Sequence, residues 1–180
     1  MSQRFATAQW IPYSVDLVFA FFANPNNLPL LMPESMKMRI EELELVPAPP
    51  NPTIAGSRLA PEVIAAGAGT EMKISFRPAS YVPVRVSWVA RITEFAWNSH
   101  FCDEQVRGPF GSFRHRHGVR PEIQQGRLGT LVTDEVEFSL PLGSVGQVWD
   151  KAVDRQMKKM FRIRQERLPA ILGAKVRQVP

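Results

Sequence analysis

The sequence predicts an α+β fold in which a curved antiparallel β-sheet of about six to seven strands is wrapped around a long C-terminal α-helix. Three observations support this prediction. A strand-like segment and two short helical segments open the chain, alternating apolar and polar residues then recur up to residue 140, and an apolar stripe of helical period closes it. Strands that follow one another without intervening helices favour antiparallel pairing.

The first segments are one strand and two short helices. Residues Arg4–Trp10 have strand-like content, and Ser14 is a suitable N-cap for a buried helix over Val15–Ala23. A second short helix is expected at Leu28–Met32, where Pro33 ends it.

The middle of the chain alternates as strands do. Strands are expected at Met36–Val46 (with a one-residue irregularity), Thr70–Phe76, Val84–Phe95, the two arms of His100–His117, and Leu131–Leu140. The prolines of residues 47–52 predict a loop, and Gly126–Gly129 predicts a turn. Residues 53–69 are rich in Ala and Gly and predict no definite element.

A long amphipathic helix is expected from about Gly146 to Leu168, roughly 35 Å at 1.5 Å per residue. Its apolar residues recur at helical spacing: Val148, Trp149, Ala152, Val153, Met157, Met160, Phe161 and Leu168. This stripe must be buried against one face of the sheet. A curved sheet that holds a long helix leaves a gap suited to a ligand.

The hairpin His100–His117 carries acid, amide, imidazole and aromatic side chains at every second position, and therefore on one face. A three-residue loop, Gly108–Phe110, pairs Phe101 with His117, Asp103 with His115 and Gln105 with Phe113. A two-residue loop would instead place His100, Cys102 and Glu104 beside the histidines. The first register is favoured, because it leaves Arg114 and Arg116 outside with Glu104.

This polar face has three interpretations. His115 and His117 could bind a metal ion, with His100 or Asp103 as the third ligand. They could instead form a hydrogen-bonded network with Asp103 and Gln105, or orient a bound ligand. The last two are favoured, and no metal or cofactor is assigned. An Asp103–His115 contact would also orient a general base.

The composition is that of a single globular domain, residues 1–180, with 44% hydrophobic and 22% charged residues. One cysteine, Cys102, excludes an intrachain disulfide and suits a reducing compartment. No apolar run approaches the roughly 18 residues that a membrane span requires. We therefore expect a cytoplasmic protein.

The net charge of +5 is concentrated near the C-terminus, where residues 151–177 hold nine Lys and Arg against two acidic residues. A solvated helix face is the favoured interpretation. The alternative is transient contact with an anionic membrane surface through Lys151, Arg155, Lys158 and Arg162. No aromatic platform for bases accompanies these charges, so no nucleic-acid partner is expected.

The hairpin motif also suggests a family. Phe-x-Asp-x-Gln-x-x-Gly-Pro-Phe, followed by an aromatic residue and His-x-His, matches Phe101, Asp103, Gln105, Gly108–Phe110, Phe113, His115 and His117. With Ser14–Asn27, Asp134, Pro141–Gly143 and the basic terminal helix, it resembles the START-like (SRPBCC) superfamily of helix-grip proteins, and more narrowly its uncharacterised bacterial members. Phe113 stands where Trp is usual, and residues 47–69 are longer and richer in proline than expected.

The resemblance implies binding, and a role in transport, of a small hydrophobic ligand of lipid-, quinone- or polyketide-like type between sheet and helix. The side chains expected to contact it are Phe101, Asp103, Gln105, Phe113, His115 and His117. The alternative is an acid/base enzyme of the polyketide cyclase/aromatase type that uses the same cavity. Non-enzymatic binding is ranked first, and no catalytic residue is assigned.

Overall fold

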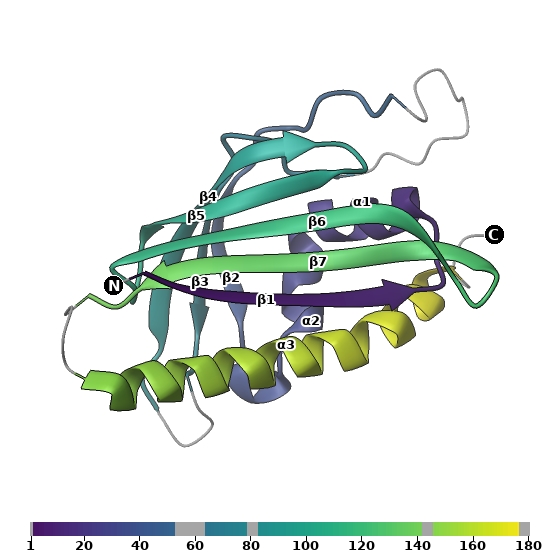
Figure 1. Ribbon diagram of the computed structural model, residues 1–180. Coiled ribbons are helices and arrows are strands. Elements are labelled where there is room, and N and C mark those ends of the chain that lie inside the picture. The colour runs from purple at the N-terminus through teal and green to yellow at the C-terminus, as the bar shows by residue number, and fades with distance from the viewer. Residues whose placement is uncertain (1, 53–63, 79–82, 142–145, 177–180) are drawn as a thin grey trace.

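The computed structural model describes residues 2–52, 64–78, 83–141 and 146–176 (Figure 1). Seven strands form one antiparallel sheet in the order β1-β7-β6-β5-β4-β3-β2. Their bounds are β1 Ser2–Ile11, β2 Arg39–Glu44, β3 Glu71–Phe76, β4 Val86–Ala96, β5 His100–Arg107, β6 Ser112–Gln124 and β7 Arg127–Ser139. The predicted fold class is confirmed.

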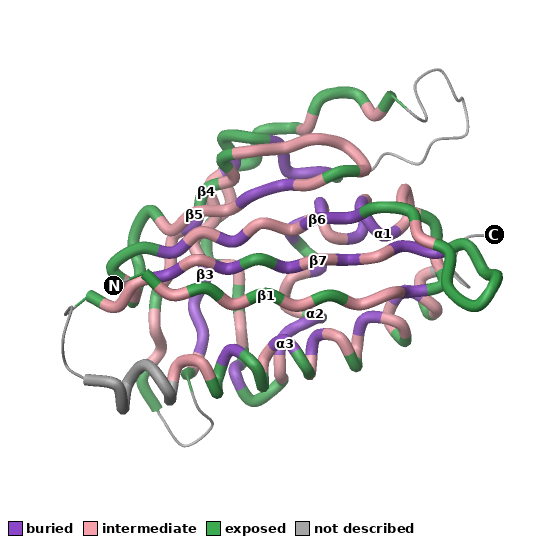
Figure 2. Tube along the Cα trace, in the orientation of Figure 1, coloured by how far each residue is buried: buried purple, intermediate pink, exposed green. Residues whose placement is uncertain are grey.

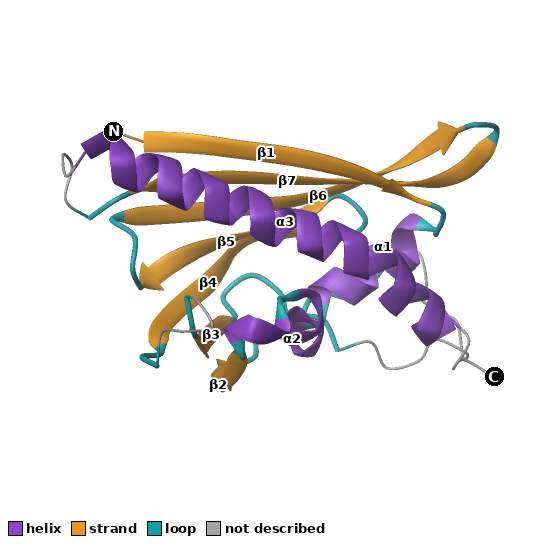
Figure 3. Ribbon diagram, turned by 90° about the horizontal axis from the view of Figure 1, so that it is seen from below, coloured by secondary structure: helices purple, strands orange, loops and turns teal. Residues whose placement is uncertain are grey.

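Helices cover one face of this sheet (Figure 3). The long helix α3, Gly146–Val176, runs across the face, and α1, Val15–Ala23, and α2, Leu28–Leu31, lie on the same side. Two short 3-10 helices, Pro25–Asn27 and Glu34–Met36, flank α2. The α1 bounds are those predicted from the sequence, and its Ser14 cap accepts a hydrogen bond from the backbone N–H of Leu17 at 3.4 Å.

Irregular pairing accompanies the curvature of the sheet. The β2–β3 register shifts between Ile40 and Glu42, as the predicted irregularity of this strand required. The β4–β5 register shifts twice, between Val89 and Ala90 and again between Ile92 and Glu94. Such bulges bend and twist the strands that carry them. The sheet is therefore strongly curved from β1 round to β2 (Figures 1 and 3).

The β5–β6 hairpin has the register predicted for a three-residue loop. Asp103 lies opposite His115 and Phe101 opposite His117. The ladder ends at Glu104 and Arg114, so Gln105 and Phe113 do not form a ladder pair. On the outer face, Arg114 forms ion pairs with Glu94 and Glu104 at 2.7 and 3.3 Å. Cys102 points to that outer side and is fully buried.

The β6–β7 hairpin is longer than predicted. Its turn contains only Gln125 and Gly126, both with positive φ, and Gln124 pairs directly with Arg127. Two residues of positive φ form the tight turn that suits the twist of paired strands. Strand β7 therefore begins at Arg127 instead of Leu131.

Helix α3 also exceeds its prediction and continues through Pro169 to Val176. Leu168 and Leu172 are buried on either side of the proline, so the apolar stripe holds the last turns against the core. At the other end of the sheet, Phe161 and Met157 pack with Phe138. Figure 2 shows the alternation of buried and exposed positions along the strands that this packing produces.

Some sequence-based interpretations lie outside the described residues. They concern residues 53–63, Leu142 and Gly143, and the side chains of Val148, Trp149, Lys151 and Ala152. Within the described residues, no helix is long and apolar enough to cross a membrane.

Candidate functional site

A cavity of about 340 Å³ lies between the sheet and α3. Its volume is within the range of small-molecule sites. Six of the seven methionines line it: Met32, Met36, Met38, Met72, Met157 and Met160. Aromatic side chains contribute much of the remaining wall: Phe21, Phe22, Phe76, Trp88, Phe101, Phe110, Phe113 and Phe161. Methionine side chains are flexible and polarizable, so this wall can adapt to apolar molecules of different shape.

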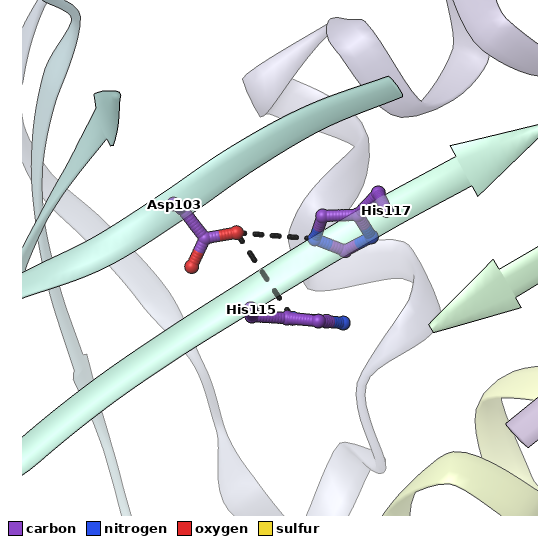
Figure 4. A group of neighbouring side chains, drawn as sticks. All are labelled: Asp103, His115 and His117. Atoms are coloured by element: carbon purple, nitrogen blue, oxygen red, sulfur yellow. Dashed lines mark hydrogen bonds and ion pairs between the residues drawn. The ribbon is translucent and has the colours of Figure 1, made fainter. Parts of the chain in front are cut away.

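One polar cluster interrupts the apolar wall. Strand β5 contributes Asp103, β6 contributes His115 and His117, and α3 contributes Arg164. Asp134 of β7 is buried beside both histidines. Alternation along the strands places the first three side chains on the inner face, and Figure 4 shows Asp103 directed toward both imidazoles.

Asp103 contacts His117, and Asp134 contacts both histidines. Nε2 of His117 lies 3.1 Å from Oδ1 of Asp103, and Nε2 of His115 lies 2.9 Å from Oδ1 of Asp134. Nδ1 of His117 also lies 3.1 Å from the same oxygen of Asp134. The contact expected between Asp103 and His115 is longer, at 4.0 Å, so Asp134 is the residue that orients His115.

Arg164 completes the cluster from the helix side. Its Nη2 lies 3.4 Å from Oδ1 of Asp134 and 3.1 Å from Nδ1 of His117. The guanidinium also lies over the rings of Phe22 and Phe161, 5.0 and 5.5 Å from their centroids. These cation–π contacts fix the position of a charge whose side chain is only 6% exposed.

The pKa values of the two histidines are shifted in opposite directions by their surroundings. Burial lowers the pKa of His115, and the neighbouring charge of His117 lowers it further, which favours a neutral imidazole. Burial opposes the charged form of His117 too, but hydrogen bonds to Asp103 and Asp134 outweigh it and raise its pKa. Burial alone would raise the pKa of Asp134, yet the charge of Arg164 and the histidine hydrogen bonds hold that pKa well below its usual range.

The predicted aromatic residues line the cavity. Phe101 stacks on His117, with ring centroids 4.3 Å apart and planes at 21°. Phe113 meets the ring of Trp88 edge-on at 4.6 Å. These contacts restrict the rotation of both rings and make them a fixed part of the wall.

Gln105 is placed differently from the other predicted residues. Its Nε2 donates to the carbonyl oxygen of Phe110 at 2.8 Å, and its Oε1 accepts from the Phe110 N–H at 3.3 Å. It does not belong to the cavity wall, whereas Phe110 does. The Gln105 side chain therefore holds the backbone of Phe110 in the hairpin loop, and the Phe110 ring in turn lines the cavity.

Asp103, His115 and His117 also meet the distance criterion for a metal site, with one potential ligand atom from each residue within 4.8 Å of the others. His100 is not part of this group and instead contacts Ser99 at 3.0 Å. Two features of the cluster oppose a bound cation. The Arg164 guanidinium lies against Nδ1 of His117, and the raised pKa of His117 favours a proton on the imidazole.

Comparison with solved structures places this architecture among known folds. The structure of TTHA0849 from Thermus thermophilus superposes with a TM-score of 0.62 at 18% identity, over 96% of this chain and 99% of that one. The structure of Ara h 8.0201 superposes with a TM-score of 0.55 at 13% identity, over 92% of this chain and 97% of that one. The chain has the Bet v 1-like, START-like (SRPBCC) helix-grip fold. No family model and no curated protein sequence matches the chain.

Two members of the cluster on this helix-grip scaffold were not among the residues predicted to bind ligand. Asp134 entered the sequence analysis only as part of the resemblance. Arg164 was counted only as one of the nine Lys and Arg of residues 151–177. It lies three residues after Phe161 and four before Leu168, and both of these are buried. A charge on the apolar stripe of an amphipathic helix was the signal that could have identified it.

Proposed function

We propose that the chain is a cytoplasmic protein that binds and transports a small hydrophobic ligand of lipid-, quinone- or polyketide-like type. The observation that carries this proposal is a cavity with a mainly apolar, methionine-rich wall that also holds the cluster of Asp103, His115, His117 and Arg164. The helix-grip fold, which commonly binds small hydrophobic ligands, supports it.

The polar and aromatic residues have different roles in this proposal. Asp103, His115 and His117 orient the polar end of the ligand, and Phe101 and Phe113 enclose its apolar part. Gln105 acts through the hairpin loop, because both its hydrogen bonds go to the backbone of Phe110.

Native mass spectrometry of the purified protein, followed by organic extraction, tests the proposal. We expect an adduct that dissociates on unfolding and extracts as a lipophile. A panel of lipids, quinones and polyketides should also raise the melting temperature, since a ligand that binds only the folded state stabilises it. If nothing lipophilic co-purifies and no compound in the panel raises the melting temperature, the proposal is wrong.

A variant that fills the cavity supplies the control. Ala90 is buried on the inner face of β4 and lines the cavity, whereas Ser87 is exposed on the outer face of the same strand. Ala90→Phe should reduce the adduct and the ligand-induced stabilisation. Ser87→Phe adds the same ring outside the cavity and should leave both unchanged.

His115 supports a second candidate function, an acid/base enzyme of the polyketide cyclase/aromatase type. A neutral imidazole on the cavity wall, oriented by the Asp134 carboxylate, is suited to accept a proton from a bound substrate. His115→Gln distinguishes the two functions. It should abolish turnover by such an enzyme, but weaken ligand binding by a carrier only about tenfold or less, the scale of one hydrogen bond.

Contact with an anionic membrane would suit a carrier. Arg155, Lys158 and Arg162 are exposed on α3, although Lys158 pairs with Asp154 at 2.8 Å. We expect co-sedimentation with phosphatidylserine-containing vesicles that decreases as salt is raised. Absence of binding at low salt would exclude this contact.

A further inference from the structure

We propose that the polar end of the ligand is an uncharged hydrogen-bond donor, such as an alcohol or phenol hydroxyl, received by the free carboxylate oxygen of Asp103. The inference rests on the proposed binding function and specifies the class of ligand. Carboxylates and other anionic head groups are excluded by the same cluster.

The orientation of Asp103 is the first argument. Its contacts with His115 and His117 both use Oδ1. Figure 4 shows the other oxygen directed away from the two imidazoles. The Asp103 side chain lines the cavity and is 22% exposed, against 8% for His115 and 11% for His117. Asp103 is therefore the most exposed of these three side chains, and its carboxylate can only accept hydrogen bonds.

The second argument is the hydrogen bonding of His115. Its Nε2 faces Asp134, and a carboxylate partner places the imidazole proton on that nitrogen. In the neutral ring, Nδ1 is then an acceptor, and it lies 4.0 Å from Oδ1 of Asp103. Both groups offer lone pairs, so the complementary ligand group is a donor.

The third argument concerns charge. Asp103 and Asp134 are matched by Arg164 and a protonated His117, and the cluster carries a net negative charge if His117 is neutral. In either state an anionic head group meets two carboxylates without a free cation to offset them.

The cations of the cavity wall lead to the same conclusion. Among the described residues, Arg91 and Arg164 are the only lysines or arginines that line the cavity. Arg91 pairs with Glu71 at 2.8 Å and Arg164 with Asp134 at 3.4 Å. Both guanidinium groups are therefore already engaged by carboxylates.

Matched ligands test the inference on the full-length protein. Dissociation constants of 1-decanol, decanoate and 1-methoxydecane are measured by calorimetry at pH 7.5. Decanol should bind at least tenfold more tightly than decanoate, which carries the excluded charge. It should also bind at least tenfold more tightly than the methyl ether, which keeps an oxygen but has no donor.

The Asp103→Asn variant tests the residue itself. It removes one negative charge and replaces one carboxylate oxygen with an amide NH2 group that can donate to an anion, so the ratio of decanoate to decanol affinity should rise at least tenfold. Glu104→Gln removes the same charge from the outer face of the next position and should leave the ratio unchanged. If Asp103→Asn does not fold, the comparison of decanol with its ether on the native protein decides the question.

The outcomes separate this inference from the proposed function. Equal or tighter binding of decanoate, or of the methyl ether, overturns the donor specificity while supporting a hydrophobic cavity. Failure of all three compounds to bind argues against the proposed function itself.

Discussion

Arg164 of α3 reaches across the cavity wall to within 3.4 Å of Asp134 of β7, and both side chains are 6% exposed. This pair joins the long helix to β7, the strand next to the edge strand β1, at the point where the two histidines of β6 lie. A buried ion pair of this kind adds little net stability, because removing two charges from water offsets their attraction. Loss of one partner is different, since it leaves a buried charge uncompensated.

We therefore expect Arg164→Met to lower the free energy of unfolding by roughly 3–5 kcal/mol, measured by urea denaturation. Adding Asp134→Asn to this variant should recover part of the loss, because it removes the uncompensated carboxylate. Arg162→Met, on the exposed face of the same helix, should change stability by less than about 0.5 kcal/mol. Similar effects of the two arginine substitutions would contradict this account of the pair.

The same carboxylate predicts how stability responds to acid. The pKa of Asp134 lies well below 3.8 in the folded protein, so the unfolded chain binds more protons in acid. Its contribution is fully present above about pH 3.8 and is lost as pH falls toward the folded-state pKa. The pKa of Asp103 shifts in the same direction.

Asp134→Asn should consequently flatten the decline of unfolding free energy below about pH 4, without abolishing it. Denaturation curves at successive pH values measure this slope for both proteins. His115 and His117 shift in opposite directions, so their contributions to the slope near pH 6.5 oppose each other. An unchanged acid slope in the variant would mean that Asp134 does not stabilise the fold in ionised form.

The features that were predicted correctly from the sequence are those that a single segment of the chain encodes. The register of the β5–β6 hairpin depended on one loop length, and only one choice of that length paired Arg114 with Glu104 on the outer face. The apolar stripe of α3 likewise identified the helix from its own spacing. Both features are encoded within a single segment of the chain.

Contacts that depend on the path of a loop or on a distant segment could not be predicted from alternation and helical spacing. Gln105 was predicted to contact ligand from its strand position, but its amide reaches forward to a loop backbone whose path alternation does not determine. Arg164 belongs to the cluster only because α3 crosses β6 and β7 near His117. The helix was expected to end at about Leu168, the last residue of the predicted apolar stripe. It continues through Pro169, where a side chain from β1 compensates for the missing N–H.

That compensation gives a prediction of its own. Proline has no N–H to donate to the carbonyl of Gln165, four residues earlier, and Nε2 of Gln9 donates to this oxygen at 2.8 Å. Gln165 in turn donates from its side chain to Oγ1 of Thr7 at 2.8 Å. We expect Gln9→Leu to cost about 1–3 kcal/mol of unfolding free energy, because a half-buried carbonyl loses its donor.

A double-mutant cycle with Pro169→Ala tests the mechanism. Alanine restores the helical N–H, so Gln9→Leu should cost less in that background than in the native chain. Gln3→Leu, on the same face of β1, is the matched control and should show the same small effect in both backgrounds. An equal cost of Gln9→Leu with and without the proline would mean that Gln9 stabilises the helix by some other route.

Cys102 offers a test of the hairpin register from the side opposite the cavity. The thiol is fully buried, and burial raises its pKa to about 11, so almost no reactive thiolate is present at neutral pH. We expect an aromatic disulfide reagent to modify the native protein only as fast as local or global unfolding exposes the sulfur. Unfolding in urea should make the reaction immediate.

An exposed thiol and a bound ligand supply the controls for this labelling. A cysteine introduced as Gln124→Cys, at the exposed end of β6, in a Cys102→Ala background should react at once in the native state. Because Cys102 faces away from the cavity, a bound ligand should slow its modification only in proportion to the stability that the ligand adds. Rapid labelling of native Cys102 that a ligand blocks completely would place the thiol on the cavity side and overturn the register.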